Sequence, residues 1–463
     1  MITHVRELQS ADEMRARRHN AIVARAPARP PVKQLLVKNS ILVLLGPGGV
    51  GKTTIAAALG LAAARASLET VVITLDPARR LRDALGLERL SARPARLDPR
   101  RLRAAGLDPA LQLSAMVLDS KRVWDGLVAR LVKTPAARQR ILDNSFYQSL
   151  TEQFAGAEAY AALEQLYDLH NGGGFAVEIV DTPPAAHAFE FIQAPAHLIR
   201  LLDSRAARWL FIPYAAAGKS VLGIANRAAR FVVGQLEQFA GIRTLTAISE
   251  FFGAAAEAAD SISDRFRKVD ALLHSPAVTF VLVTTAEEDR LREARALVDQ
   301  MEAEGLRLGA IVLNRLLDEP TFAALIAAPG RSPAHLAAIP RLRATRAPLR
   351  GRDSAGPSTN PDTNDALVSF LEQYGAHQRA AIERATRFAR DLPPRIELAA
   401  APEIAAGVRD LATLAKVATI VIEAGAGRIF LARAAAALGV TPSPAQAKPA
   451  ARKAPPGKRR ASR

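Results

Sequence analysis

A glycine-rich stretch constrains the fold of this chain more than any other feature. Residues 41–45 before it are all aliphatic, and residues 55–66 after it are rich in alanine. Between the two runs, every fixed position of the pattern G-x-x-x-x-G-K-[ST] is matched. The stretch reads Gly46, Pro47, Gly48, Gly49, Val50, Gly51, Lys52, Thr53 and Thr54. The pattern predicts a strand, a phosphate-binding loop and the N-terminus of a helix.

The residue types of this loop suit a nucleoside polyphosphate. Glycines let consecutive backbone N–H groups curl around phosphates without Cβ clashes, and the helix N-terminus adds partial positive charge. We expect Lys52 to reach the β- and γ-phosphates and the Thr53 hydroxyl to ligate Mg²⁺. The stretch therefore predicts a nucleotide site.

Three other predicted strands end in polar side chains, at Asp76, Asp181 and Asn314. Ligands of α/β sheets bind at the carboxyl ends of strands. Asp181 stands where the aspartate of a P-loop NTPase holds Mg²⁺, and we expect it to hold the metal through water. The Asp76 carboxylate is placed to orient or deprotonate an attacking water. An aspartate at this place is equally well explained as a helix cap. The Asn314 amide suits the adenine edge.

Four motifs in order resemble the ArsA/GET family, the arsenite-pump and tail-anchored-protein-targeting ATPases. They are the loop, the stretch 76–86 that begins Asp-Pro-Ala, the stretch 180–184 (Val-Asp-Thr-Pro-Pro) with His187, and 312–315 (Val-Leu-Asn-Arg). The resemblance spans residues 39–418. It implies a dimer that closes over ATP and Mg²⁺ and is coupled to a helical subdomain.

The resemblance also implies roles for single residues. The first switch contains Asp76, which positions water, and Pro77. The second switch contains Asp181, Thr182 and His187. Asn314 with Arg315, and Pro402 in a later loop, match the contacts to the base.

Two departures from the family pattern affect the expected activity. The family's lysine at the second loop position, which reaches the partner's phosphates, is replaced by Pro47, which has neither a side-chain donor nor an N–H. The chain has no cysteine, so the family's zinc pair and thiolate capture of arsenite are excluded. With a single phosphate-binding loop, two sites require two chains.

Alternating strands and helices predict an α/β fold, a P-loop NTPase with a mainly parallel sheet flanked by helices and an inserted helical subdomain. We expect a basic lead-in at 1–38, the ATPase domain at 39–418 with its helical insert at about 196–273, and a possible extra helix at 419–440. A basic, disordered tail would occupy 441–463.

The insert carries two apolar stripes. The first has alternating spacings of three and four over four heptads, and the second is shorter. One explanation for both stripes is a pair of helices that pack on each other and on the ATPase domain. The more specific hypothesis is a helical subdomain whose apolar faces close over a hydrophobic client or a partner subunit. The first comprises Leu245, Ile248, Phe252, Ala255, Ala259, Ile262, Phe266, Val269 and Leu273, and the second Val221, Ile224, Ala228, Phe231, Gln235 and Phe239.

The net charge of +17 is concentrated at the chain ends. The tail 441–463 has seven Lys or Arg and no acid, and residues 1–40 have eight against three acids. Aromatic residues make up 5% of the chain, so no stacking platform for nucleic acid is evident, and we expect none as partner. No signal peptide or spanning helix is predicted, which favours a cytoplasmic protein, either free or peripheral at the membrane.

Three functions fit these observations. The first is an ATPase in which a helical subdomain responds to the nucleotide and binds a client or partner. The second, motivated by Pro47, is a slowly hydrolysing subunit that forms a heterodimer with a lysine-bearing paralogue. The third is a partitioning ATPase of the membrane or nucleoid that uses the basic ends.

Overall fold

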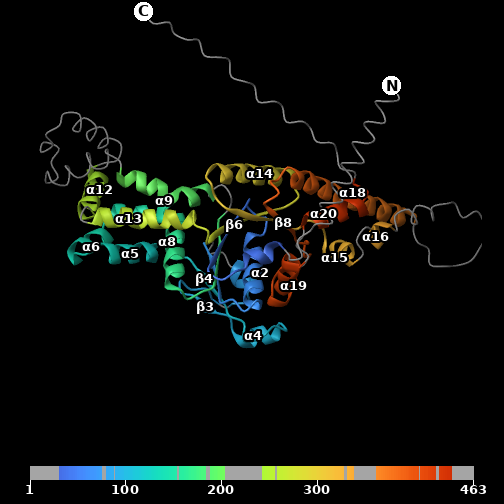
Figure 1. Cartoon of the computed structure of the whole chain (residues 1–463), viewed down its shortest axis with the longest axis horizontal. Helices are drawn as coiled ribbons and strands as arrows, with labels where there is room; N and C mark the ends of the chain where they lie inside the picture. Colours follow the sequence, from blue (N-terminus) through green and yellow to red (C-terminus); the bar gives the residue numbers. More distant parts are fainter. Residues whose placement is uncertain are drawn as a thin grey trace, which may run out of the picture.

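The computed structural model places an α/β core between a helical bundle at one end and a long helix at the other (Figure 1). It describes residues 31–75, 80–87, 89–153, 156–183, 188–203, 242–255, 258–327, 331–337, 361–405, 407–423 and 427–440. Several features of the sequence lie outside these residues, namely Asp76, Pro77, His187, the shorter apolar stripe and the tail 441–463.

Eight strands form one sheet in the order β3-β4-β2-β5-β1-β6-β7-β8. All neighbouring pairs are parallel except β3 with β4. This confirms the predicted fold class. The strands are β1 Ser40–Leu45, β2 Thr70–Thr74, β3 Ala95–Arg96, β4 Leu113–Val117, β5 Val177–Asp181, β6 Val278–Thr284, β7 Leu308–Leu313 and β8 Glu397–Ala400.

Helices cover both faces of the sheet because the strands are aliphatic on both sides, as expected for parallel strands. Leu42 and Leu44 of β1 face the layer of α2 and α19, while Ile41, Val43 and Leu45 face the opposite layer. The helical elements are η1 Pro31–Leu35, α2 Lys52–Arg65, α3 Arg80–Ala84, α4 Pro99–Ala104, α5 Ser120–Leu131, α6 Pro135–Leu142, α7 Ser145–Gln153, α8 Ala157–Gly172, α9 Ala188–Asp203, α12 Ile242–Ala255, α13 Ala259–Leu273, α14 Glu288–Ala303, α15 Glu319–Ala327, α16 Ala334–Ala337, α18 Pro361–Arg390, α19 Leu411–Glu423 and α20 Gly427–Ala437.

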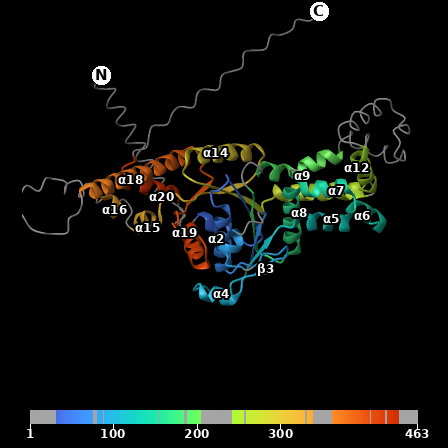
Figure 2. The same ribbon diagram turned by 180° about the vertical axis from the view of Figure 1, so that it is seen from behind.

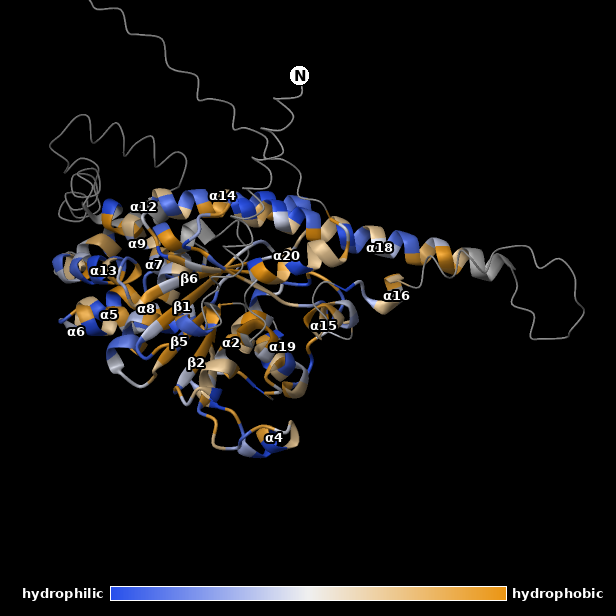
Figure 3. Cartoon of the chain, turned by 45° about the vertical axis from the view of Figure 1, so that its right-hand side comes forward, coloured by the Kyte–Doolittle hydropathy of each residue, from blue (hydrophilic) through white to orange (hydrophobic). Residues whose placement is uncertain are grey.

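Hydropathy follows this layering. Apolar residues concentrate in the strands and in α2, whereas α14 and α18 show polar residues along their length (Figure 3). No helix among the described residues is long and apolar enough to cross a membrane.

The helical bundle is larger than the predicted insert. It combines α9, α12 and α13 with α5–α8, which precede β5 in the chain, and Figure 2 shows these helices gathered at one end of the sheet. No sequence pattern assigns residues 120–172 to the insert, because their contacts with α12 and α13 join segments more than 70 residues apart.

The longer apolar stripe is divided between α12 and α13 and does not form one rod. Ala255, Phe266, Val269 and Leu273 of this stripe are buried in the main core. Phe266 packs on Tyr160 of α8, with 4.5 Å between ring centroids. The described part of the stripe thus packs inside the bundle, as the first explanation of the stripe expects.

Residues 419–440 hold the end of α19 and all of α20, which packs on α18 and β8. Arg428 at the start of α20 donates to the backbone oxygens of Ala389, Leu392 and Pro393. These oxygens lie at and just beyond the C-terminal end of α18, where helical carbonyls lack partners. Arg428 therefore fixes the end of α18 against the sheet.

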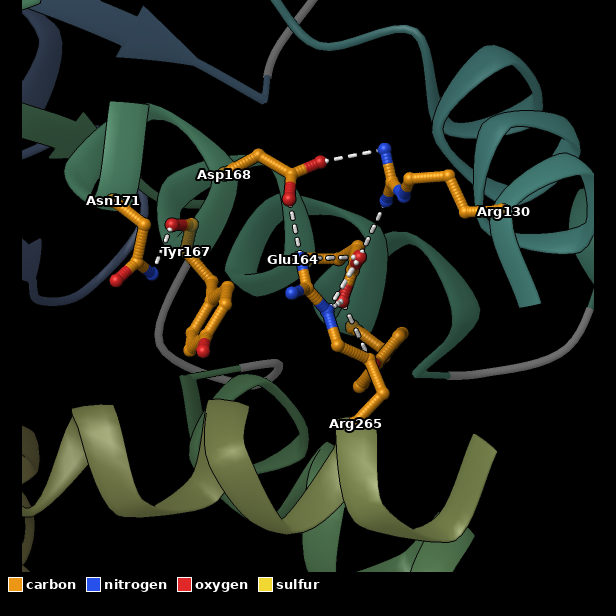
Figure 4. A network of polar contacts seen from close by, with 7 residues as sticks. Arg130, Glu164, Tyr167, Asp168, Asn171 and Arg265 are labelled. Carbon is orange, nitrogen blue, oxygen red and sulfur yellow. Dashed lines mark hydrogen bonds and ion pairs between the residues drawn. The ribbon is translucent and has the colours of Figure 1, made fainter. Parts of the chain in front are cut away.

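A buried network of charges holds the bundle together (Figure 4). Glu164 of α8 has no exposed surface and accepts hydrogen bonds from Arg130 of α5 at 2.7 Å, Arg265 of α13 at 2.9 Å and Tyr160 at 3.0 Å. Both arginines also pair with Asp168, one turn along α8. Both carboxylate oxygens of Glu164 thus accept hydrogen bonds. A buried charge is tolerated under this condition.

Glu178, in the middle of β5, is the opposite case. It is 1% exposed, and neither carboxyl oxygen has a hydrogen-bond partner within the described structure. Burial raises its pKa from 4.5 to about 8. His170 Nδ1 of α8 lies 3.6 Å from Glu178 Oε2, and burial lowers the pKa of this imidazole. At neutral pH both groups are therefore held uncharged.

We predict that Glu178→Gln raises the melting temperature at about pH 9 but not near pH 5. A raised pKa in the folded state favours folding below the unfolded-state pKa of 4.5, and this benefit is lost as the pH rises through about 8. The loss amounts to about 1.4 kcal/mol per pH unit in this window. Thermal melts of wild type and variant at the two pH values measure it.

Glu164→Gln is the matched control, because it removes the charge that two arginines require. It should lower the melting temperature at both pH values, by an amount equivalent to about 3 kcal/mol or more. Equal effects of pH on the wild type and the Glu178→Gln variant would contradict the assignment of a proton to Glu178.

Candidate functional site

The glycine-rich stretch forms a tight loop between β1 and α2, as the sequence predicts. Gly46 has a φ of 146°, and a Cβ on it would lie 2.0 Å from the Val283 oxygen of β6. Gly51, immediately before α2, has a φ of 91°, and its Cβ would lie 2.3 Å from Nδ2 of Asn314. Both positions therefore require glycine, since a side chain would be strained and would clash with a fixed neighbour.

Lys52 folds back over this loop and is almost fully buried. Its Nζ donates to the backbone oxygens of Gly46 at 2.9 Å and Pro47 at 3.1 Å. The ammonium group thus lies on the inner side of the loop, where phosphate oxygens could take the place of the two carbonyl oxygens as acceptors.

Asp181 joins three elements at one corner of the site. Its Oδ2 accepts from the Thr53 hydroxyl of α2 at 2.7 Å and from the Thr74 hydroxyl of β2 at 3.1 Å. The parallel register places it there, because Asp181 lies opposite Leu44 on β1 and Thr74 on β2. A hydroxyl and a carboxylate oxygen are hard ligands that suit Mg²⁺, with water completing the coordination. The residues present therefore fit a magnesium ion.

Thr182, the residue after Asp181, connects the end of β5 with β1, the strand before the loop. The Thr182 hydroxyl donates to the Leu44 oxygen at 2.6 Å, and its side chain is buried. Leu75 N donates to the Asp181 backbone oxygen at 3.2 Å, so the end of the segment that follows β2 lies beside Asp181. Asp76, Pro77 and His187 themselves lie outside the described residues, and their roles stay predictions.

Asn314 contacts the loop directly. Its Nδ2 donates to the Val50 oxygen at 2.7 Å, and its backbone N–H donates to Thr284 at the end of β6. Arg315 follows with a φ of 52°, which turns the chain away from the strand, and its side chain is exposed. The amide therefore braces the loop besides any contact it makes with a base.

The segment around Pro402 lies against the residues that follow Asn314. Leu316 N donates to the Ala401 oxygen at 3.0 Å, and Glu403 N donates to the Leu317 oxygen at 2.7 Å. Pro402 between them is buried. The structure thus brings together Asn314, Arg315 and Pro402, which the sequence separates by almost 90 residues.

Two residues of this region were missed by the sequence reasoning. Thr74 bonds Asp181, and Tyr374 of α18 donates to Asp318 beside the Pro402 segment. Burial and the Asp318 carboxylate raise the pKa of Tyr374 to about 12. A threonine at the end of a strand is too common to be noticed, although its place two residues before Asp76 was a usable signal. Tyr374 gave no signal.

The fold and the loop define a P-loop nucleotide-binding protein. The sequence profile of the anion-transporting ATPases matches residues 39–325, and the chain belongs to this ArsA-type ATPase family. It is 24% identical over 298 residues to the ATPase GET3 of Malassezia globosa, covering 63% of this chain and 78% of the relative. It is 23% identical over 283 residues to a putative arsenical pump-driving ATPase of Aquifex aeolicus, covering 60% and 64%.

We predict that Thr74→Val raises the Mg²⁺ concentration needed for half-maximal nucleotide binding by about tenfold, the usual cost of losing a bond that orients a metal ligand. Valine keeps the shape of the side chain but removes one of the two hydroxyls that hold Asp181 Oδ2. A Mg²⁺ titration with a fluorescent ATP analogue measures the effect.

Thr70→Val, on the same strand, is the control, because its hydroxyl donates to the Leu68 oxygen at 2.8 Å away from the site. Its Mg²⁺ requirement should equal that of the wild type. If Thr74→Val also leaves the requirement unchanged, Thr74 does not orient the metal ligand.

Proposed function

We propose that this chain hydrolyses ATP with Mg²⁺ and transmits the state of the nucleotide to its helical bundle, where a client or partner binds. The bond of Thr53 to Asp181 carries the proposal, because it joins the phosphate-binding loop to the strand that continues into the second switch. Membership of an ATPase family supports the same reaction.

In the proposed mechanism, each residue has one task. Backbone N–H groups of the loop bind the β- and γ-phosphates, and Lys52 leaves the Gly46 and Pro47 oxygens to neutralise charge on the transferred phosphoryl group. Thr53, and Asp181 through water, would hold a Mg²⁺ ion, which would supply positive charge to the phosphate groups. Asp76 positions the attacking water. Asn314, Arg315 and Pro402 form the side of the site that receives the base.

The connection to the bundle follows the chain. The bundle helix α8 leads into β5, which ends at Asp181, and α9 of the bundle follows the second switch. Helix α13 leads into β6, whose Val283 oxygen contacts Gly46. Since Arg265 binds α13 to Glu164 of α8, a movement at either strand end is passed to both helices. The bundle therefore responds to the site as one body.

We predict that Asp76→Asn reduces the rate of ATP turnover by about 10²–10⁴-fold, the usual contribution of a group that handles the proton of the attacking water. Binding of ATP should be nearly unchanged, because Lys52 and the loop remain. Steady-state phosphate release and equilibrium binding separate the two effects.

Asp83→Asn is the control for this variant, because Asp83 is exposed and pairs only with the neighbouring Arg82 within the described structure. It should hydrolyse ATP at the rate of the wild type. A normal rate for Asp76→Asn would remove Asp76 from the mechanism.

Pro47 favours a second candidate, in which the chain is the slower subunit of a heterodimer with a paralogue that supplies the lysine. For a homodimer, we predict that ATP turnover per chain rises with protein concentration and that light scattering detects a dimer in ATP. For the heterodimer subunit, we predict a low, constant turnover that rises when the paralogue is added. A lysine restored by Pro47→Lys should then raise the rate without the paralogue.

The partitioning ATPase remains the least supported alternative. It depends on the basic residues of 1–38 and 441–463, most of which lie outside the described residues. We propose that the chain is located in the cytoplasm, either free or peripheral at the membrane.

A further inference from the structure

A group of exposed arginines lies at the edge of the sheet opposite the phosphate-binding loop. We call Arg93, Arg96, Arg100 and Arg103, on β3, α4 and the loop before them, the arginine lobe. β3 runs antiparallel to β4, so α4 lies at the amino ends of the parallel strands, whereas the loop follows the carboxyl end of β1. The lobe is thus separate from the nucleotide site.

The lobe is a fixed part of the fold. Its leucines Leu97, Leu102, Leu107 and Leu111 are buried in the core on the α2 side of the sheet. Asp98 caps α4 by accepting from Arg100 N at 2.8 Å, and Val117 N donates to the Ser91 oxygen at 3.0 Å. The four guanidinium groups are therefore presented from a rigid support.

The charge of the lobe is not neutralised within the described part of the chain. None of the four arginines forms an ion pair there, whereas Arg290, Arg292 and Arg295 of α14 all do. The two aspartates of the lobe, Asp98 and Asp108, use their carboxylates to accept from backbone N–H groups. The lobe therefore presents a local excess of positive charge to an outside partner.

The shape of the lobe restricts the partner. In all three ribbon views, which share one vertical axis, α4 is the lowest helix and projects beyond the other described elements (Figures 1, 2 and 3). A flat surface can touch such a tip without meeting the bundle or α18. A surface that touches α4 faces the edge of the sheet away from the nucleotide, which leaves the site accessible.

The chemistry of the lobe restricts the partner further. Residues 80–123 contain no Phe, Tyr or Trp, so bases have no aromatic side chain to stack on. No large apolar side chain of the lobe is exposed. Binding must therefore depend on charge and on hydrogen bonds from guanidinium groups, whose paired N–H donors match phosphate oxygens.

We propose that the arginine lobe docks this protein on the phosphate headgroups of an anionic lipid bilayer. A bilayer is flat and carries a continuous negative potential, so it complements a convex and unpaired positive tip. Without an apolar anchor, the attachment is reversible and weakens as salt is added. The proposal does not depend on hydrolysis of ATP.

The test compares full-length proteins in flotation with vesicles of equal parts phosphatidylcholine and phosphatidylglycerol. The variant carries Arg93→Gln, Arg100→Gln and Arg103→Gln. We expect its partition to these vesicles at low salt to fall on the order of a hundredfold, because an arginine near an anionic surface contributes about fivefold. Vesicles of phosphatidylcholine alone should bind neither protein. The basic tail 441–463 is present in both proteins, so the comparison isolates the lobe.

The matched control removes the same charge from elsewhere, with Arg331→Gln, Arg379→Gln and Arg409→Gln. These arginines are also exposed and form no ion pair within the described residues. The control should partition at least ten times better than the lobe variant. The proposal is overturned if the two variants lose binding equally. It is also overturned if the lobe variant loses as much affinity for a DNA duplex as for the vesicles.

Discussion

The hydrogen bond from Thr53 to Asp181 connects the parts of this protein that have to act together. Thr53 belongs to the first turn of α2, and Asp181 ends β5. Thr74 bonds the same carboxylate oxygen from β2, so three elements meet on one acceptor in the buried interior. A buried carboxylate needs such donors, because leaving it unpaired is costly. The phosphate-binding loop and the ends of β2 and β5 are therefore held in one geometry.

Two buried glutamates show how differently the same side chain is used. Glu164 is surrounded by donors from α5, α8 and α13 and binds the bundle helices to one another. Glu178 has no hydrogen-bond partner within the described structure and avoids the cost of burial by keeping its proton. The first stabilises the connection between the bundle and the site. The second makes the strand that carries Asp181 sensitive to alkaline pH.

The family explains the site better than it explains the cellular role. The loop, Asp181 and Asn314 lie together in a chain that belongs to the ArsA-type ATPase family. Pro47 and the absence of cysteine remove chemistry that the resemblance would otherwise imply. The client or partner of the chain therefore has to be inferred from the surfaces that could bind it. The helical bundle and the arginine lobe lie on different sides of the sheet, so a client and a membrane could be bound at the same time.

The sequence alone determined the nucleotide site, because the loop is a local structure. Glycines at fixed spacing, a lysine and a threonine specify it without help from distant residues. The fold class also followed, since aliphatic runs alternating with helical segments permit few arrangements. Only the tertiary structure decided what depends on long-range contacts. It placed Thr74 and Tyr374 at the site, added α5–α8 to the bundle, and divided the apolar stripe between two helices. Periodicity specifies which face of a helix is buried but not the partner that covers it.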